Sequence, residues 1–395
     1  MEGVGDATKN TDRPIRPLRN GDLNKVDINE TRLHAEEGNT AAQGILGSAY
    51  LFGEDGEDID YAEALRWLSQ AAEKGAYGPI GWLGDMYAQG LGVDKDINKA
   101  ILLYKESSAR GNFNTALLLA RMYSQGLQVT VDTNEALRWY TVVFAHPGID
   151  PDDEDVGEAK RYLTAIDGHE IALINLLERD PLAIVRAGAA TVLSMLQPKS
   201  AIPALIKAAG NTTDTVRPAV IWALGEFKEW EGANLPSKAA VTELLLSSME
   251  DDNDQVREAA AGSIYRGSHD NQETRARLCK ALNDSYSGVR AQAAFALSVF
   301  EDETLVYKLE WLLLNDELSP LYFSAAECLG DSYLLPSVIT AAERWRQTEH
   351  YEDLEEDTAI QSAIDYLTEV ADDDPEGGDQ PGEEDEGAMD DGQPD

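Results

Sequence analysis

The chain has 395 residues, of which 43% are hydrophobic, so it can bury the cores of two or three ordinary domains. Its 73 acidic and 32 basic residues give a net charge of −41, and residues 1–370 still carry −29 without the acidic last 25 residues. Such a field repels nucleic-acid phosphates and anionic lipid headgroups, so we predict neither as a partner. It favours a protein partner with a basic surface, or a halophilic, high-salt cytoplasm that screens the self-repulsion.

No apolar run approaches the roughly 18–20 residues of a membrane span, and the acidic N-terminus is not typical of a secretory signal. The two cysteines, Cys279 and Cys328, are too few for a disulfide framework or for a zinc site of ordinary spacing. Both lie in helical apolar patterns, which favours two small buried residues. We therefore predict a cytoplasmic protein without a membrane segment.

Residues 1–27 carry prolines and scattered charge without apolar periodicity, and we predict a disordered arm there. A period of 36–37 residues follows over residues 28–146, which indicates a repeat architecture. Each unit has the pattern of two helices, with a glycine that ends the first helix and an aspartate that caps the second. The recurring positions are Tyr50, Tyr87 and Tyr123; Gly53, Gly90 and Gly126; Asp60, Asp96 and Asp132; and Ala64, Ala100 and Ala136.

This pattern resembles the Sel1-like repeat, a relative of the tetratricopeptide repeat. The middle copy matches best, at Gly84, Tyr87 and Gly90, whereas the third copy departs from the pattern at Gln128. The resemblance implies a right-handed αα superhelix, in a family whose members are adaptors that hold proteins together. The tyrosine series Tyr50, Tyr87 and Tyr123 could form a binding stripe, but packing within each repeat is the favoured interpretation.

Residues 147–155 are rich in aspartate and proline. A calcium loop of the EF-hand type would need a glycine and a glutamate at its sixth and twelfth positions, where this chain has Asp155 and Arg161 when counted from Asp150. We therefore predict a solvated acidic linker between two arrays.

A second periodicity covers residues 156–370, with a Val-Arg pair that recurs at Arg186, Arg217, Arg257 and Arg290 and a tyrosine, Tyr322, in the fifth copy. These copies resemble HEAT repeats of the short, phycobilin-lyase-like type. The resemblance implies that each arginine pairs with an aspartate of a neighbouring repeat. A row of phosphate-binding arginines is the alternative, which the surrounding acidity disfavours. Aspartates precede the arginines at the turns: Asp180, Asp214, Asp254 and Asp284.

The longest step in this series contains an insertion at residues 226–237. Such insertions lie in loops on one face of a repeat array, often the binding face. Trp230 stands there between Glu229 and Glu231, outside the apolar stripe of either helix. We predict these three residues as partner-binding, with Trp230 as the anchor.

Residues 355–370 have the pattern of a last helix whose apolar stripe, Ile360, Ile364 and Leu367, would cap the open end of the array. Residues 371–395 are acidic and rich in glycine and proline, and we predict a disordered tail.

No catalytic motif accompanies the repeats. The five histidines form no metal-binding pair, and there is no phosphate-binding loop and no nucleophile elbow. Some HEAT-repeat enzymes, the di-iron deoxyhypusine hydroxylases, bind metal through several His-Glu dipeptides. This chain has one, His169-Glu170, and one copy cannot build such a site. We therefore predict no catalytic residue, no cofactor, no metal and no small-molecule substrate.

The sequence thus predicts an all-α protein of two consecutive αα-repeat solenoids. Its predicted function is that of a non-catalytic scaffold or adaptor, which binds a protein on concave repeat surfaces. Two alternatives remain open. One is a tetrapyrrole (bilin) lyase-like protein or chaperone, and the other is an acidic neutralising or immunity protein that blocks a basic partner.

Overall fold

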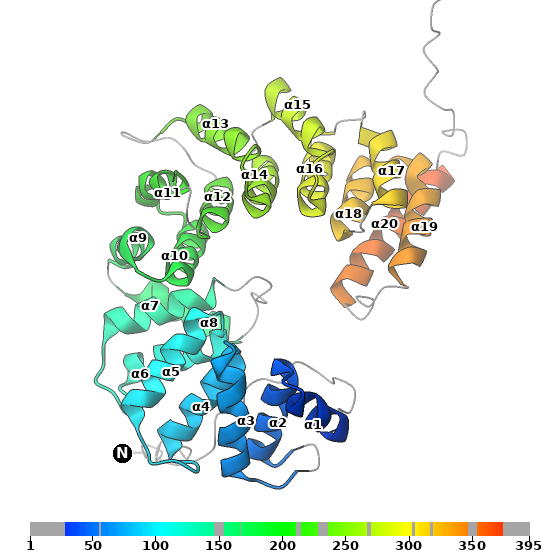
Figure 1. The fold of residues 1–395 in the computed structure, drawn as a ribbon. Coiled ribbons are helices and arrows are strands. Elements are labelled where there is room, and N and C mark those ends of the chain that lie inside the picture. The colour runs from blue at the N-terminus through cyan, green and yellow to red at the C-terminus, as the bar shows by residue number, and fades with distance from the viewer. Residues whose placement is uncertain are drawn as a thin grey trace, which may run out of the picture. The chain divides into compact units, whose positions relative to one another are not determined.

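The computed structural model describes residues 28–54, 57–145, 154–166, 168–210, 215–227, 236–266, 270–301, 305–316, 319–346 and 354–373. Helices and the turns between them account for these residues, and none of the described residues lies in a strand (Figure 1). The prediction of an all-α repeat protein is confirmed. The predicted arm at residues 1–27 and residues 374–395 of the predicted tail lie outside the described residues.

The chain divides into two compact units, Met1–Val216 and Arg217–Asp395. The division reflects how densely backbone segments pack and not where the repeat type changes. The predicted domain bounds, which follow repeat type, stay a prediction.

The first unit begins with the helices of the Sel1-like repeats. Each first helix ends at a glycine in the left-handed region, with φ of 69° at Gly53, 77° at Gly90 and 73° at Gly126. The helices are α1 (Ile28–Glu36), α2 (Thr40–Phe52), α3 (Tyr61–Glu73), α4 (Tyr77–Gln89), α5 (Ile97–Ala109), α6 (Phe113–Gln125) and α7 (Thr133–Val143).

The capping aspartates fix the loop between the two helices of each repeat. The Asp60 carboxylate accepts hydrogen bonds from the amides of Ala62 and Glu63 at the start of α3. The amide of the same residue donates to the carbonyl of Tyr50, at 2.9 Å. The contact between Asp96 and Tyr87 and the contact between Asp132 and Tyr123 have the same length, so the loop geometry repeats with the sequence.

The first unit continues with α8 (Glu154–Ala165), α9 (His169–Arg179), α10 (Ala183–Leu196), η1 (Lys199–Ala201) and α11 (Ile202–Ala209). The helix α10 packs against α7, the last Sel1-like helix. Gly188 allows this approach, because a Cβ atom there would lie 2.0 Å from the carbonyl oxygen of Thr141. Two residues of the predicted linker, Glu154 and Asp155, form the first turn of α8.

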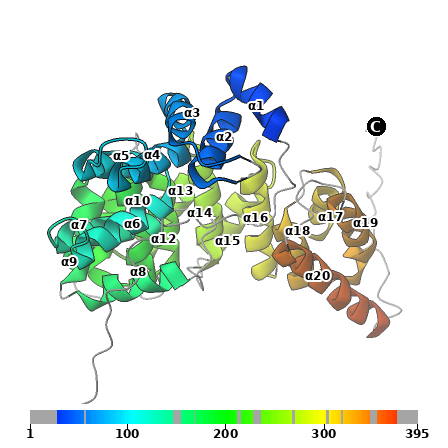
Figure 2. The same ribbon diagram turned by 90° about the horizontal axis from the view of Figure 1, so that it is seen from below.

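The second unit consists of two helical layers. The helices α12, α14, α16, α18 and α20 pack side by side, and α16, α18 and α20 are seen together in Figure 2. The helices α13, α15, α17 and α19 form the other layer. The bounds are α12 (Arg217–Glu226), α13 (Lys238–Ser248), α14 (Asp254–Arg266), α15 (Gln272–Ala281), α16 (Ser287–Val299), α17 (Val306–Asn315), α18 (Pro320–Leu329), η3 (Ser332–Leu334), α19 (Leu335–Trp345) and α20 (Leu354–Asp373).

The last helix, α20, packs against α18 and α19. Ile360 and Leu367 of the predicted stripe are fully buried there, and Ile364 is half-buried.

The interpretation of the two cysteines as buried is wrong, because both are exposed. In α15 the buried stripe is carried by Leu278 and Ala281, so Cys279 lies one position away from it. In α18 the core positions are Ala325 and Ala326, and Cys328 lies beyond them. Neighbouring positions on a helix point in directions about 100° apart, which is enough to move a side chain from core to solvent.

Candidate functional site

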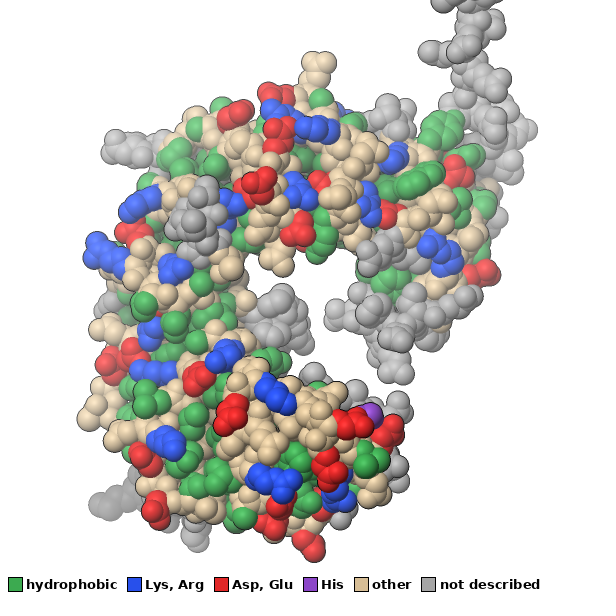
Figure 3. Space-filling model, viewed as in Figure 1, with side chains coloured by type: hydrophobic (Ala, Val, Ile, Leu, Met, Phe, Trp, Pro, Cys, Tyr) green, Lys and Arg blue, Asp and Glu red, His purple; other side chains and the backbone are tan. Residues whose placement is uncertain are grey.

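The predicted partner-binding residues Glu229, Trp230 and Glu231 lie outside the described residues, and their role stays a prediction. The described surface does not gather its charges into one patch on the viewed face. Acidic and basic side chains are interspersed over the Sel1-like helices there (Figure 3).

The repeat tyrosines are half-buried and contact cations of their own array. The Tyr50 hydroxyl accepts a hydrogen bond from Arg32 Nη2 at 3.2 Å. The Lys99 ammonium lies 3.8 Å from the centre of the Tyr87 ring, within cation–π range. Lys105 lies 5.4 Å from the centre of the Tyr123 ring. These contacts are internal, in keeping with a packing role for the tyrosines.

In the second unit the HEAT-like arginines form a ladder of ion pairs. Arg257 donates from Nε and Nη2 to both carboxylate oxygens of Asp284, each at 2.9 Å, and from Nη1 to the carbonyl of Asp251. Arg290 repeats the arrangement with the carboxylate of Asp316 and the carbonyl of Asp284. Hydrogen bonding by the Arg257 guanidinium holds the pKa of Asp284 below its usual range.

Two contacts of this ladder were not specified by the sequence pattern. Arg217 pairs with Asp251 and not with Asp254, which is exposed at the start of α14. At the far end Tyr322 takes the arginine position, and its hydroxyl donates to the carboxylate of Asp316 at 2.7 Å. Because these guanidinium groups are committed to neighbouring carboxylates, the ladder is not a free row of phosphate-binding cations.

In the first unit the same contact joins the two repeat types. Arg138 of α7 donates from Nε and Nη2 to the carboxylate of Asp180, at 2.6 and 3.1 Å, and Arg186 Nη1 donates to the carbonyl of Asp180. Arg138 therefore contacts Asp180 as Arg257 contacts Asp284 in the second unit. Arg138 was not among the predicted residues, because it lies in a Sel1-like repeat without the Val-Arg pair.

One side of the first helices stays partly accessible in all three Sel1-like repeats. We call it the first-helix face. Its aromatic part is Phe52 of α2 and Trp82 of α4, whose rings meet edge to face at a centroid distance of 6.4 Å. The face consists of Ile45, Ser48 and Phe52 on α2, Trp82 and Asp85 on α4, and Leu118 and Arg121 on α6.

Asp85 is the single charged residue of α4, whose other residues apart from Gln89 are apolar, aromatic or small. Its carboxylate accepts a hydrogen bond from the Tyr104 hydroxyl at 2.7 Å, and the salt bridges of the described residues give it no cation. Burial raises the pKa of Asp85 to about 7, although the Tyr104 hydrogen bond acts in the opposite direction. Gly84 makes room for this tyrosine, since a Cβ atom there would lie 2.6 Å from its ring.

One repeat further on, the equivalent position carries Arg121, and here the face is already occupied. Arg121 donates to the carboxylates of Asp155 and Glu158 on α8, with Nη2 2.7 Å from Asp155. Tyr140, which occupies the register of Tyr104, donates to Glu158 at 2.6 Å. Two carboxylates of α8 thus contact the first-helix face of the third repeat at Arg121, while α8 itself packs against α7.

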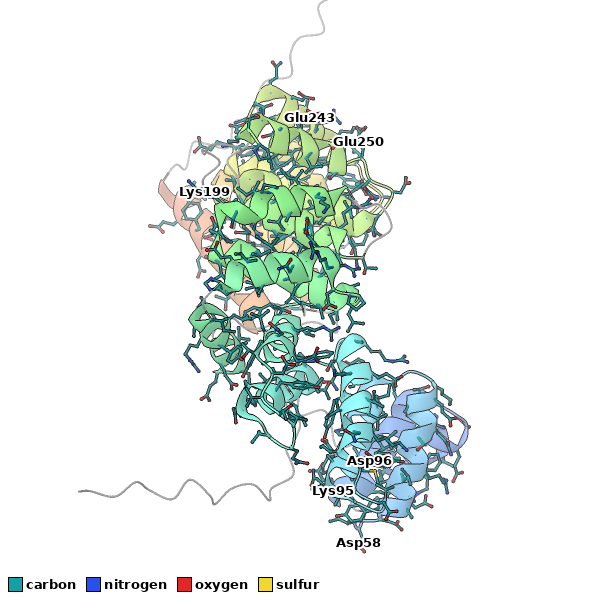
Figure 4. The ribbon with its side chains drawn as sticks, turned by 90° about the vertical axis from the view of Figure 1, so that its left-hand side faces the viewer. Asp58, Lys95, Asp96, Lys199, Glu243 and Glu250 are labelled. Carbon is teal, nitrogen blue, oxygen red and sulfur yellow. The ribbon has the colours of Figure 1, made fainter. Side chains whose placement is uncertain are left out.

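The loops that follow the first helices lie along one edge of the Sel1-like array. Asp58, from the loop after α2, and Lys95 and Asp96, from the loop after α4, are seen together there (Figure 4). These loops also expose the hydrophobic side chains of Ile59, Leu127 and Val131.

The His-Glu dipeptide has structural contacts. His169 Nδ1 lies 2.9 Å from the carbonyl oxygen of Ile166, and Glu170 accepts a hydrogen bond from the Ser200 hydroxyl at 3.1 Å. Within the described ranges, no group of three or more His, Cys, Asp or Glu side chains could hold a metal ion. None of the described helices is long and apolar enough to cross a membrane.

The stacked helix pairs define the class of this protein as an αα-repeat solenoid. The family models give the repeat types. The Sel1 repeat model matches residues 40–75, 82–112 and 115–141, and the HEAT repeat model matches residues 171–265 and 242–330. The chain therefore carries Sel1 repeats followed by HEAT repeats, as the sequence patterns predict.

Several solved structures are similar to the chain. YibA of Escherichia coli is 23% identical, with 75% of this chain and 96% of that chain covered and a TM-score of 0.37. The protective antigen c5321 of uropathogenic Escherichia coli, which has an SLR fold, is 14% identical, with 94% and 100% covered and a TM-score of 0.28. A Sel1 repeat protein of Oxalobacter formigenes is 18% identical, with 65% and 98% covered and a TM-score of 0.26. No curated protein matches the chain.

Proposed function

We propose that the protein is a non-catalytic scaffold or adaptor, and that its Sel1 repeats bind a basic segment of a partner protein on the first-helix face. Sel1 and HEAT repeats both build extended binding surfaces in which neighbouring repeats each contribute a few side chains. The observation that carries the proposal is the contrast between Arg121 and Asp85, two residues in the same register of successive repeats.

At Arg121 the face contacts two carboxylates of α8, so this register accepts oppositely charged side chains from a helix. At Asp85 the charge is reversed and no described cation pairs with it. A lysine or arginine of a partner would supply the missing charge, and a hydrogen bond to a charged group contributes about 1.5–3 kcal/mol. Apolar residues beside that cation would contact Phe52, Trp82 and Leu118. The net charge of −41 would speed the encounter with such a partner at low salt.

The test selects a random peptide-display library against the full chain. We expect selected peptides to place a lysine or arginine beside apolar residues, and to bind Asp85→Asn at least 10-fold more weakly, as 1.5 kcal/mol or more requires. Asp58→Asn makes the same chemical change at an exposed carboxylate of the same array and should leave affinity unchanged. Peptides that bind Asp85→Asn and Trp82→Ala as tightly as the parent chain would refute the proposal.

The affinity of the selected peptides should also depend on pH. A bound cation requires the ionised carboxylate, and Asp85 has a pKa of about 7 in the free protein. Binding should therefore weaken as the pH falls below 7, by up to tenfold per pH unit, and should be constant above 8. The Asp85→Asn variant should lack this pH dependence.

A further inference from the structure

The outward side of α17 in the second unit is apolar. Tyr307 is 49% exposed, Trp311 51% and Leu314 37%. The spacing i, i+4 and i+7 places all three on one side of the helix, and hydrophobic side chains are visible over α17 in Figure 3. We call these three residues the α17 ridge.

The other helices of the same layer have polar residues, alanine or proline at these positions. The register is set by the buried residues Leu245, Leu278, Leu309 and Val338, one in each helix. All the outward positions are exposed, and Figure 4 shows Glu243 and Glu250 of α13 among them. Trp311 corresponds to Ser247, Lys280 and Thr340; Tyr307 corresponds to Glu243, Ala276 and Pro336; and Leu314 corresponds to Glu250, Asn283 and Glu343.

The fold therefore does not require aromatic residues on this face, since three sister helices reach the same packing without them. Exposed large apolar side chains that stand together mark interaction sites more often than single ones do. Tryptophan and tyrosine are also the residues that contribute most to binding free energy at protein interfaces.

The ridge is held in place before any partner arrives. The Tyr307 ring meets the Tyr333 ring edge to face at a centroid distance of 5.9 Å, and the Lys308 ammonium lies 4.7 Å from the centre of the Trp311 ring. Arg344 Nη1 donates to the carbonyls of Leu313 and Leu314, which fixes the end of the helix. Rings that are already ordered lose less entropy when they bind.

The charges around the ridge indicate the chemistry of the partner. Lys308 donates to the amide oxygen of Asn283, and both this group and the Trp311 ring are neutral, so no described carboxylate neutralises the lysine. Glu310 is the only carboxylate on α17, and it accepts hydrogen bonds from Tyr333 and Ser337. In a chain of net charge −41, this face presents a cation beside apolar rings, and no described carboxylate is paired with it.

We propose that the α17 ridge docks an amphipathic helix of a partner protein, with apolar residues against Tyr307, Trp311 and Leu314 and an acidic residue against Lys308. The partner chemistry is thus opposite in charge to that of the first-helix face, and the inference does not depend on that site. A second copy of this chain fits poorly, because it would bring two Lys308 cations and two strongly acidic chains together.

The test uses a helical peptide-display library with leucine fixed at i, i+3, i+4 and i+7, and with Glu, Lys or Ala at the flanking positions. Selection against the full chain carrying Asp85→Asn, which lacks the carboxylate of the first-helix face, should enrich glutamate at one flanking position. The selected peptides should bind Trp311→Ala at least about 30-fold more weakly, the loss typical of an interface hot spot. Thr340→Ala, a change at the equivalent outward position of α19, should leave affinity unchanged.

The contribution of the Lys308 charge is tested by reversing it. With Lys308→Glu, selection should enrich lysine in place of glutamate. Failure to select any peptide, enrichment of lysine with the Asp85→Asn chain that keeps Lys308, or equal affinity for the chain that also carries Trp311→Ala would overturn the proposal. A concentration-dependent mass in sedimentation that disappears in Trp311→Ala would overturn it in favour of self-association. Trp311 is half exposed, so its variant should keep the helical circular dichroism of the parent, which is measured alongside.

Discussion

Replacing Asp85 by asparagine should stabilise the Sel1 array at neutral pH and leave it nearly unchanged in acid. The asparagine side chain has the same shape, and its amide oxygen still accepts the hydrogen bond from Tyr104, so the main change is the loss of the ionisable group. In the parent chain, burial raises the pKa of Asp85 from near 4 to about 7. Ionisation of this carboxyl therefore opposes folding.

The size and sign of the expected change in the free energy of unfolding follow from this pKa. A rise from about 4 to about 7 corresponds to about 4 kcal/mol, an upper value because the residue is partly accessible. Below pH 4 the carboxyl is protonated whether the chain is folded or unfolded, so it contributes no pH dependence. Between pH 4 and pH 7 the folded state holds a proton that the unfolded state releases, and the parent loses about 1.4 kcal/mol per pH unit relative to Asp85→Asn. Above pH 7 the difference is constant.

The assay is hydrogen exchange measured by mass spectrometry on peptides from α4 and α5, corrected for intrinsic exchange, between pH 5 and pH 8. Repeat arrays open locally, so peptide-level protection reports the free energy of the repeat that contains Asp85. Asp58→Asn, at an exposed carboxylate, is the control and should change protection by less than about 0.5 kcal/mol. The reasoning is refuted if protection of α4 and α5 in Asp85→Asn follows the parent within that margin at both pH 5 and pH 8.

Three further changes test other parts of the fold. Gln128 has φ of 62°, so Gln128→Gly should stabilise the third repeat by about 0.5–1 kcal/mol in urea unfolding, whereas Gln128→Ala should not. Gly188→Ala places a Cβ atom against the backbone of Thr141, and it should destabilise the contact of α7 with α10 by about 2–3 kcal/mol. The loss is measured as faster hydrogen exchange in both helices, and unchanged exchange would contradict this packing. Arg257→Ala and Asp284→Ala should couple by about 1–3 kcal/mol in a double-mutant cycle, and additive effects would show that their contact does not stabilise the second unit.

The repeat architecture could be predicted because each repeat encodes its own turns. Gly90 and Asp96 act within a few residues of themselves, through a left-handed backbone and a capping carboxylate, so their spacing carries the structure directly. The last helix was predicted over residues 355–370 and spans Leu354–Asp373, because its apolar stripe has a clear helical period.

The contacts that depend on tertiary packing could not be predicted in this way. Arg138 reaches Asp180 across 42 residues and across the change of repeat type, where no period relates the two positions. Asp251 and Asp254 lie three residues apart in one turn, and only the packed backbone decides which of them meets Arg217. The pKa of Asp85 arises from its burial beside Tyr104, which composition does not report, although a lone charge in an apolar helix is a usable signal.

The contacts of Arg121 and Arg138 limit where new repeats can be added to the array during evolution. Repeats multiply by duplication of a single unit, and a new copy must fit the neighbours on both of its sides. The third Sel1 repeat holds α8 through Arg121 and Asp180 through Arg138, and a copy inserted after it would separate both residues from their partners. Duplication of the first or second repeat leaves both contacts in place. Longer relatives of this chain should therefore carry their extra Sel1 repeats before the third one, with the pair of arginines kept in the last.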